Sequence, residues 1–326
     1  MRRSDRLELA LFEMACGIAR RLPLWVLQAT FSGLARLIVA SNERRVHWAR
    51  VNLRIAYPEH SEAEHRALVR ASYVNLAWNF VDLLRVQSWS AREIREHVAL
   101  EGFEHLREAL SEGRGAVLIV PHLGQLELGV QALALAGIDC VVVERVLPNR
   151  RLYARLRSAR ARFGAEPIDR VGAMRPMVRA LRKGRCVVVA LDQFAGRSGR
   201  VFVPFFGVRV ATSSVVALLA ERTQAAVLPA CVVRDGADHH RARILPRLTT
   251  PRTGDRQADV EAATALYTSA LEHLIRSHPE QWMWAYRRFR GSPDLLEDPY
   301  ARRGLSPWRC LRRGARRGPR APRGAV

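Results

Sequence analysis

The chain has 326 residues, 48% of them hydrophobic, and a formal net charge of +22 at pH 7. That is enough material for one large domain or two small ones with a sizeable core. The five cysteines are dispersed, odd in number and never spaced as CxxC, which excludes a disulfide framework and a zinc site and favours a reducing compartment. The basic charge, carried by arginines and a single lysine, Lys183, favours anionic partners: a phospholipid surface, a nucleic acid or an acidic protein.

The first feature along the chain is a mostly apolar stretch at 22–40, which follows Arg20 and Arg21. It contains Gln28 and Arg36, and a charge is costly inside a spanning helix. Three interpretations remain: a helix lying in the membrane interface, a transmembrane span, or a buried helix of a soluble protein. We expect the first, so residues 1–40 are predicted to form a membrane-associating helix. No small-residue cleavage site is evident, which argues against a cleaved signal peptide.

Residues 1–110 have helical character throughout. The clearest segment runs from Ser61 to Gln87, where Ser61 and Glu64 have the spacing of a capping box. Apolar residues then recur at helical intervals, so we expect one long helix whose aromatic residues pack in the core.

From residue 115 the pattern changes to short apolar runs that alternate with helical segments. The predicted strands are 116–120, 138–143, 186–191 and 226–233, and the predicted helices lie near 125–136, 149–163, 172–183 and 213–223. Such alternation is typical of an α/β fold with a mostly parallel central sheet flanked by helices. Short strands without polar alternation agree with this, because they are covered on both faces.

The chain ends in a basic tail at 301–326, with nine arginines and no acidic residue. Its composition predicts disorder. Residues 41–300 are therefore expected to form the folded domain, helical at 41–110 and α/β at 111–300.

A polar pair follows the first predicted strand directly: His122, and Glu127 five residues later. On one regular helix the two would point about 140° apart. They can meet only if His122 lies in the turn and Glu127 in the first turns of the next helix. A carboxylate there would fix the tautomer of the imidazole and leave its other nitrogen as a general base. On spacing alone, a structural histidine in a turn remains the alternative.

Other catalytic signatures are missing from the sequence. There is no GxSxG, no GxxxxGK[ST], no GxGxxG and no HExxH. A serine hydrolase of the elbow type, a P-loop NTPase and a zinc protease are therefore disfavoured.

Several motifs in the order and spacing of one family extend from about residue 40 to 290. They are HLGQLELG (122–129), VERVLPNRRLYARLRSARARFGAEPID (143–169), LRKGRCVVVALDQFAG (181–196), VFVPFFG (201–207) and PEQWMWAYRRFR (279–290). The first resembles the His-x4-Asp/Glu motif of the lysophospholipid acyltransferase superfamily. Together they resemble the lipid A biosynthesis acyltransferases, the lauroyl and myristoyl transferase family. Leu191, Phe194 and Tyr286 depart from the residues usual in that family.

The resemblance implies an O-acyltransferase. His122 would remove the proton of an acceptor hydroxyl, with Glu127 holding the imidazole. Arg145 and Arg160 would bind phosphate groups, and Asp192 aligns with an acidic position of the family. The 201–207 motif has two interpretations, core packing or the lining of an acyl channel.

The implied partners are a thioester donor, either acyl-acyl carrier protein or acyl-CoA, an anionic glycolipid acceptor and the membrane surface. No metal and no bound cofactor are expected. The acceptor would be a lipid A precursor, or alternatively a phosphatidylinositol mannoside. The implied location is the cytoplasmic face of the inner membrane. A nucleic-acid-binding protein is disfavoured because the arginines are spread over every segment, and a catalytically inactive membrane scaffold because the His–Glu pair is intact.

Overall fold

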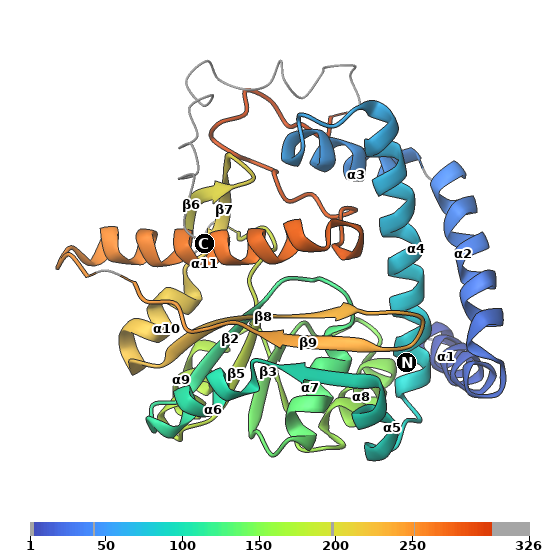
Figure 1. The fold of residues 1–326 in the computed structure, drawn as a ribbon, viewed down its shortest axis with the longest axis horizontal. Coiled ribbons are helices and arrows are strands. Elements are labelled where there is room, and N and C mark those ends of the chain that lie inside the picture. The colour runs from blue at the N-terminus through green and yellow to red at the C-terminus, as the bar shows by residue number, and fades with distance from the viewer. Residues whose placement is uncertain (1–2, 42, 197–198, 251, 302–326) are drawn as a thin grey trace.

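A seven-stranded sheet forms the centre of the computed structural model, which describes residues 3–41, 43–196, 199–250 and 252–301. The strand order is β1-β9-β8-β2-β5-β3-β4, and every neighbouring pair is parallel except β8 and β9. The predicted α/β class is therefore confirmed (Figure 1). The predicted basic tail lies outside the described residues, apart from Ala301.

The strands of this sheet are short and rich in valine. They span Val98–Glu101 (β1), Ala116–Val120 (β2), Cys140–Glu144 (β3), Glu166–Asp169 (β4), Cys186–Ala190 (β5), Ala226–Arg234 (β8) and His240–Ile244 (β9). The four predicted strands are thus found within one or two residues of their expected bounds. Two further strands, Arg200–Phe205 (β6) and Val208–Ser213 (β7), form a separate antiparallel hairpin.

Eleven helices surround the sheet in the described part of the chain. They are Arg3–Arg21 (α1), Leu24–Ser41 (α2), Glu43–Ala56 (α3), Glu62–Val86 (α4), Ala91–His97 (α5), Phe103–Ser111 (α6), Leu126–Leu135 (α7), Arg150–Ala161 (α8), Met174–Arg182 (α9), Val215–Thr223 (α10) and Arg256–Ser277 (α11). Helices α7 to α10 match the four predicted ones.

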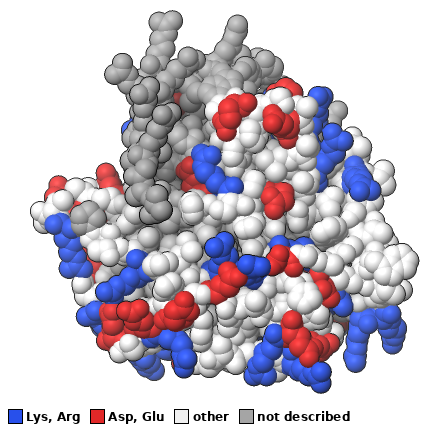
Figure 2. Space-filling view, viewed as in Figure 1, with Lys and Arg blue, Asp and Glu red and all other residues white. Residues whose placement is uncertain are grey.

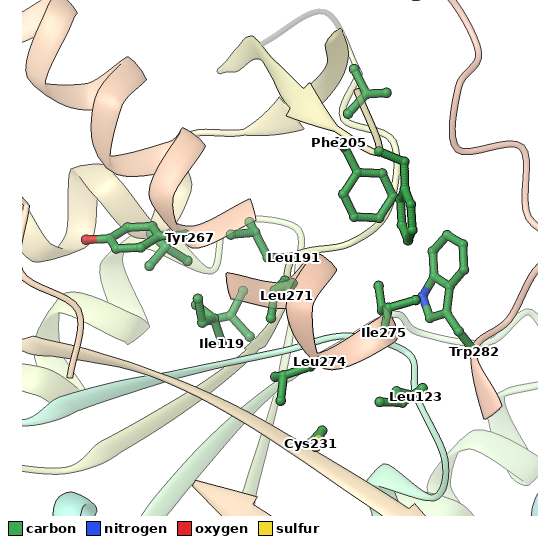
Figure 3. Packing of buried hydrophobic residues seen from close by; sticks show 14 of the residues in the cluster. Ile119, Leu123, Leu191, Phe205, Cys231, Tyr267, Leu271, Leu274, Ile275 and Trp282 are labelled. Atoms are coloured by element: carbon green, nitrogen blue, oxygen red, sulfur yellow. The ribbon is translucent and has the colours of Figure 1, made fainter. Parts of the chain in front are cut away.

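Alternate residues of the central strands face two separate cores. Val117 and Ile119 belong to the larger core, together with residues of α9, α10 and α11, and Figure 3 shows part of this packing. Leu118 and Val120 belong to the second core with residues of α6 and α7. Because each fully buried aliphatic side chain contributes about 1.5–3 kcal/mol, both faces of the sheet must be covered. This explains why the strands lack polar alternation.

The helical reading of residues 1–110 is wrong at β1. Val98–Glu101 pairs in parallel with β9, from Val98 opposite His240 to Glu101 opposite Arg243. Gly102, with φ of +67°, then turns the chain into α6, where an added Cβ would lie 2.0 Å from the carbonyl oxygen of Ile244. A four-residue edge strand has no periodicity of its own and forms here because β9 supplies its hydrogen bonds.

The long helix predicted from Ser61 is α4. Its N-terminus carries the expected capping box: Ser61 accepts a hydrogen bond from the backbone N–H of Glu64, and the Glu64 carboxylate accepts one from the backbone N–H of Ser61. The helix stands beside α2 at the edge of the fold (Figure 1). The indole of Trp78 on α4 donates a hydrogen bond to Ser32 on α2 at 2.9 Å.

Helix α2 is the one described helix that is long and apolar enough to cross a membrane, and only 17% of it is buried. Its outward residues include Leu34, Leu37 and Ile38, which are 50%, 66% and 37% exposed. Helix α1 adds a stripe of exposed apolar residues at helical spacing: Leu7, Leu11, Met14 and Ile18. The N-terminal region is therefore a candidate membrane-docking surface.

The C-terminal segment after α11 is fixed to α3 by one buried amide. The side chain of Asn52 is fully buried, and its Nδ2 donates hydrogen bonds to the carbonyl oxygens of Trp284 and Tyr286, both at 2.6 Å. Its Oδ1 accepts a hydrogen bond from the hydroxyl of Tyr300.

Replacing Asn52 with alanine should lower the melting temperature, because three buried polar groups lose their partner. The loss should be about 2–4 kcal/mol. Asn75→Ala is the control: its amide donates only to the carbonyl of Ala71 in its own helix, at 3.1 Å, so its effect on thermal unfolding should be much smaller. Equal decreases for the two variants would contradict this account of the segment.

Candidate active site

The chain makes a tight turn between β2 and α7, and this turn carries His122. Gly124 has φ of +59°, and an added Cβ there would lie 1.8 Å from the carbonyl oxygen of Val232. The turn is also held from α4, since the side chain of Asn79 donates to the carbonyl of Gly124 at 3.0 Å and Gln125 donates to the carbonyl of Asn79 at 2.6 Å. His122 therefore projects from a fixed backbone at the carboxyl edge of the sheet, where open α/β sheets bind ligands.

Asp192 is the carboxylate that contacts His122. Its Oδ1 lies 2.7 Å from Nδ1 of the imidazole, and its Oδ2 accepts the backbone N–H of His122 at 2.8 Å. The sheet register explains this contact. Val120 of β2 pairs with Ala190 of β5, and His122 and Asp192 each follow their paired residue by two positions.

Trp282 closes the back of this pair. Its indole N–H donates to Oδ2 of Asp192 at 2.7 Å, and Trp282 is only 2% exposed. The Asp192 side chain is itself 2% exposed, whereas 34% of the His122 side chain is accessible. The carboxylate is thus sequestered, and the imidazole faces the outside.

The pair shifts both pKa values. Burial alone would lower the pKa of His122, but the negative charge of Asp192 and its hydrogen bond outweigh burial and raise that pKa above its ordinary 6.5. For Asp192, burial would raise the pKa, but the charge and hydrogen bonds of His122 and the bond from Trp282 lower it below its ordinary 3.8. Asp192 is therefore charged at neutral pH and stabilises the imidazolium form.

The second ring nitrogen of His122 has a different neighbour. When Nδ1 carries the proton for Asp192, Nε2 keeps a free electron pair, and the side-chain amide of Gln193 lies 3.3 Å from it. A substrate hydroxyl that replaced this amide would find a general base already in the right tautomer.

Glu127 has another partner in the structure. Its Oε2 accepts hydrogen bonds from Nε and Nη2 of Arg160, at 2.9 and 2.6 Å, and Arg160 also contacts Glu144. Tyr153 donates to Glu144 at 2.6 Å. Glu127 was expected to hold a ring nitrogen of His122, but in the structure Asp192 occupies that position. The reason is spatial: α8 brings the Arg160 guanidinium to the first turn of α7, and a buried carboxylate gains more from a charged fork than from a neutral imidazole.

The two arginines expected to bind phosphate differ in their surroundings. Arg160 lies between two carboxylates, so its charge is balanced. Arg145 follows β3, is exposed, and has no carboxylate within ion-pair distance among the described residues. Only Arg145 of the two presents an uncompensated positive charge.

A cavity of about 410 Å³ opens beside His122, between the sheet and helices α7 and α8. His122, Glu127, Arg145 and Arg160 are among its polar lining residues. Glu144, Tyr153, Cys231 and Arg243 also line it. Most of the remaining wall is aliphatic and includes Leu118, Val130, Leu133, Val142, Val188 and Ile244. A cavity with polar residues near His122 and aliphatic residues elsewhere can hold a hydrocarbon chain whose polar end lies at His122.

The 201–207 motif does not line this cavity. Phe205 and Phe206 are buried in an aromatic cluster with Trp282 and Trp284. Figure 3 shows Phe205 and Trp282, whose ring centroids lie 5.8 Å apart. Of the two interpretations, core packing describes these phenylalanines. The motif still matters to the site, because this cluster packs against Trp282 and so against Asp192.

One group of described side chains lies close enough together to hold a metal ion: His97, Asp238 and His239, with ligand atoms within 4.8 Å of one another. These residues belong to α5 and to the turn between β8 and β9, and none of them lines the cavity. The expectation that the chemistry at His122 needs no metal stays a prediction.

The class of the protein follows from comparison with known proteins. The curated relatives of this chain are named as acyltransferases, so the chain is an acyltransferase. The family model of the bacterial lipid A biosynthesis acyltransferases matches residues 9–291, and the chain therefore belongs to that family. The resemblance found in the motifs is confirmed.

Three relatives indicate the breadth of the family. The lipid A biosynthesis palmitoleoyltransferase of Escherichia coli is 30% identical over 257 residues, which cover 77% of this chain and 80% of the relative. The lauroyltransferase of the same organism is 28% identical over 287 residues, covering 86% and 90%. The phosphatidylinositol mannoside acyltransferase of Mycolicibacterium smegmatis is 30% identical over 220 residues, covering 66% and 70%.

The His122–Asp192 pair predicts a specific pH dependence. If His122 acts as a general base, it must be neutral, so kcat/KM should rise with pH as His122 loses its proton. The acidic limb of the profile should lie above pH 6.5, because the pKa of His122 is raised above that value in the folded protein. Asp192→Asn removes the negative charge that raises the pKa of His122, so the acidic limb of the pH profile should move to lower pH. The value of kcat/KM should fall by about 10²-fold or more. In Glu127→Gln, the limb should stay in place.

The comparison of the two variants decides which carboxylate acts on the imidazole. A limb that moves in Glu127→Gln and not in Asp192→Asn would contradict the assignment of Asp192.

Proposed function

We propose that this chain transfers a fatty acyl chain from a thioester donor to a hydroxyl group of a lipid A precursor, with His122 as the general base. The observation that carries the proposal is the hydrogen-bonded His122–Asp192 pair, whose accessible imidazole lines an apolar cavity. Family membership supplies the class of acceptor.

The reaction needs no covalent enzyme intermediate. Nε2 of His122 takes the proton of the acceptor hydroxyl as its oxygen attacks the thioester carbonyl carbon. The tetrahedral intermediate then collapses, the carbon–sulfur bond breaks, and the imidazolium returns the proton to the leaving thiolate. Asp192 stabilises the imidazolium in between, and base catalysis of this kind contributes about 10²–10⁴-fold.

Glu127 and Arg160 have a supporting part in this proposal. Their ion pair joins the first turn of α7 to α8 and forms one wall of the cavity. Loss of Glu127 would leave Arg160 with Glu144 alone and loosen that wall, so we expect Glu127→Ala to reduce turnover at least about tenfold. Arg145, whose charge is uncompensated, is the candidate for a phosphate of the acceptor or of the donor's phosphopantetheine.

The donor is proposed to be acyl-acyl carrier protein or acyl-CoA. Both are anionic, and a basic protein surface speeds encounter with anionic partners. Figure 2 shows basic and acidic side chains interspersed on the visible face, without one continuous basic track such as a nucleic acid would follow. A second candidate acceptor is a phosphatidylinositol mannoside, favoured by the mycobacterial relative.

Lipid analysis tests the proposal directly. Cells that lack the protein should accumulate an under-acylated glycolipid, detected by mass spectrometry. Wild-type protein should restore the missing acyl chain and His122→Ala should not, while His122→Ala should keep the wild-type melting temperature. Restoration by His122→Ala would contradict the mechanism, and a mass change confined to phosphatidylinositol mannosides would favour the second acceptor.

We also propose that the enzyme lies on the cytoplasmic face of the inner membrane, with α1 and α2 in the interface. The contact of α2 with α4 supports this mode over a span, because Phe31 of α2 packs on Phe80 of α4 with ring centroids 5.9 Å apart. A spanning α2 would have to leave α4 or take its charged residues, such as Arg66 and Arg70, into the bilayer, which is costly.

The outward face of α2 should govern membrane affinity. Replacing Leu34, Leu37 and Ile38 together with glutamine should reduce partitioning to vesicles at least about tenfold, since each removes apolar area from the bilayer. The control replaces Val171 and Leu296, which are 78% and 59% exposed outside the N-terminal helices. Equal release of both variants would contradict the docking surface. So would cysteine labelling that places Ser4 and Ser41 on opposite sides of the membrane.

A further inference from the structure

A second cavity, of about 830 Å³, lies between α2, α3 and α4. Four arginines line it, one from α2, one from α3 and two from α4: Arg36, Arg50, Arg66 and Arg70. We call it the arginine groove. Its remaining lining residues are aliphatic, apart from Asn75 and Trp78, and no lining residue is acidic.

The charges in the arginine groove are not compensated. Within the described residues, none of the four arginines forms an ion pair, and Arg70 Nε donates only to the carbonyl of Arg66, at 3.3 Å. The nearby Glu62 is already bound in a fork by Arg54, at 2.7 and 2.8 Å, and this hydrogen bond is the main reason that the pKa of Glu62 is lowered, with a smaller effect from the charge of Arg66. Arg54 on α3 is therefore neutralised by Glu62 on α4, whereas the four groove arginines have no carboxylate partner among the described residues.

The four arginines are exposed, and like charges along one groove create a local positive potential that attracts an anion. Guanidinium suits phosphate in particular, because its planar fork can make two parallel hydrogen bonds to phosphate oxygens. The groove also has apolar walls, formed by residues such as Val39, Val69 and Val74. Phosphate beside hydrocarbon is the chemistry of a phospholipid.

The position of the groove points to a membrane lipid. Arg36 belongs to α2, whose outward residues Leu34, Leu37 and Ile38 form the docking surface described above. A helix embedded there to the depth of its apolar face holds the adjoining arginines at the level of the headgroups. Basic side chains at that level attract anionic lipids.

We propose that the arginine groove binds the headgroup phosphate of an anionic phospholipid of the bilayer. The site is separate from the cavity at His122, and the two are joined through α4. Asn75 and Trp78 line the groove. Asn79, which directly follows Trp78, donates a hydrogen bond to the carbonyl of Gly124 in the turn that carries His122. A lipid held in the groove thus fixes α4, and through it the height of His122 above the membrane; this last consequence rests on the proposed function.

Vesicle binding of the full-length protein tests the site without needing activity. The groove variant replaces Arg36, Arg50, Arg66 and Arg70 with glutamine. The control removes the same charge from exposed arginines on α9 and α10, by Arg175→Gln, Arg179→Gln, Arg182→Gln and Arg222→Gln. Figure 1 places α9 and α10 at the far side of the fold from α2 and α3. Equal melting temperatures would show that both variants fold.

On vesicles of phosphatidylcholine with added phosphatidylglycerol, the groove variant should bind at least about tenfold more weakly than the control. On phosphatidylcholine alone, the two should bind alike. Inorganic phosphate, compared with chloride at the same ionic strength, should not displace the wild-type protein. Its failure to compete would distinguish a lipid headgroup from free phosphate.

Three results would overturn the proposal. If both variants lost vesicle binding equally, the loss would be explained by net charge alone and not by the groove. Displacement by inorganic phosphate would make the ligand a free anion. Wild-type vesicle binding by the groove variant, with a lower kcat/KM on detergent-dispersed acceptor, would make the occupant the acceptor.

Discussion

The contact between His122 and Asp192 depends on one structural constraint, the parallel pairing of β2 with β5. The pairing of Val120 with Ala190 carries each chain out of the sheet at the same edge, so two residues later the imidazole and the carboxylate meet. Three neighbours stabilise this geometry. Gly124 permits the turn, Asn79 donates a hydrogen bond to it, and Trp282 donates one to the buried carboxylate. A buried, rigid sheet thus holds the imidazole and the carboxylate in a fixed geometry, which the proposed proton transfer requires.

A second arrangement sets the shape of the cavity. The ion pair of Glu127 with Arg160 joins α7 to α8, and the aliphatic side chains of the sheet face the space beneath. In the proposed function, the polar cluster beside the apolar cavity distinguishes the two ends of an acyl donor. The thioester would remain at His122, and the hydrocarbon would leave water. The exposed apolar faces of α1 and α2 form the candidate membrane-docking surface, and the proposed docking would bring the cavity close to a lipid acceptor.

The sequence predicted the layout well and the contacts less well. The Val-rich strands and the capping box of Ser61 were found in place, because those signals are local. The partner of His122 was missed, since nothing in the spacing of His122 and Asp192, 70 residues apart, reveals that β2 and β5 are neighbours. The family motifs did single out Asp192 and the segment with Trp282, although not their contact. Arg160 was expected to bind phosphate, yet its two carboxylates come from α7 and β3 and meet only in the fold.

The most direct test of the central claim is the tautomer of His122, measured by ¹⁵N NMR and assigned by comparison with His122→Ala. If Asp192 holds the ring, neutral His122 in the wild-type protein should carry its proton on Nδ1. That preference should weaken in Asp192→Asn and persist in Glu127→Gln. A proton on Nε2 in the wild-type protein, or a preference lost only in Glu127→Gln, would contradict the account.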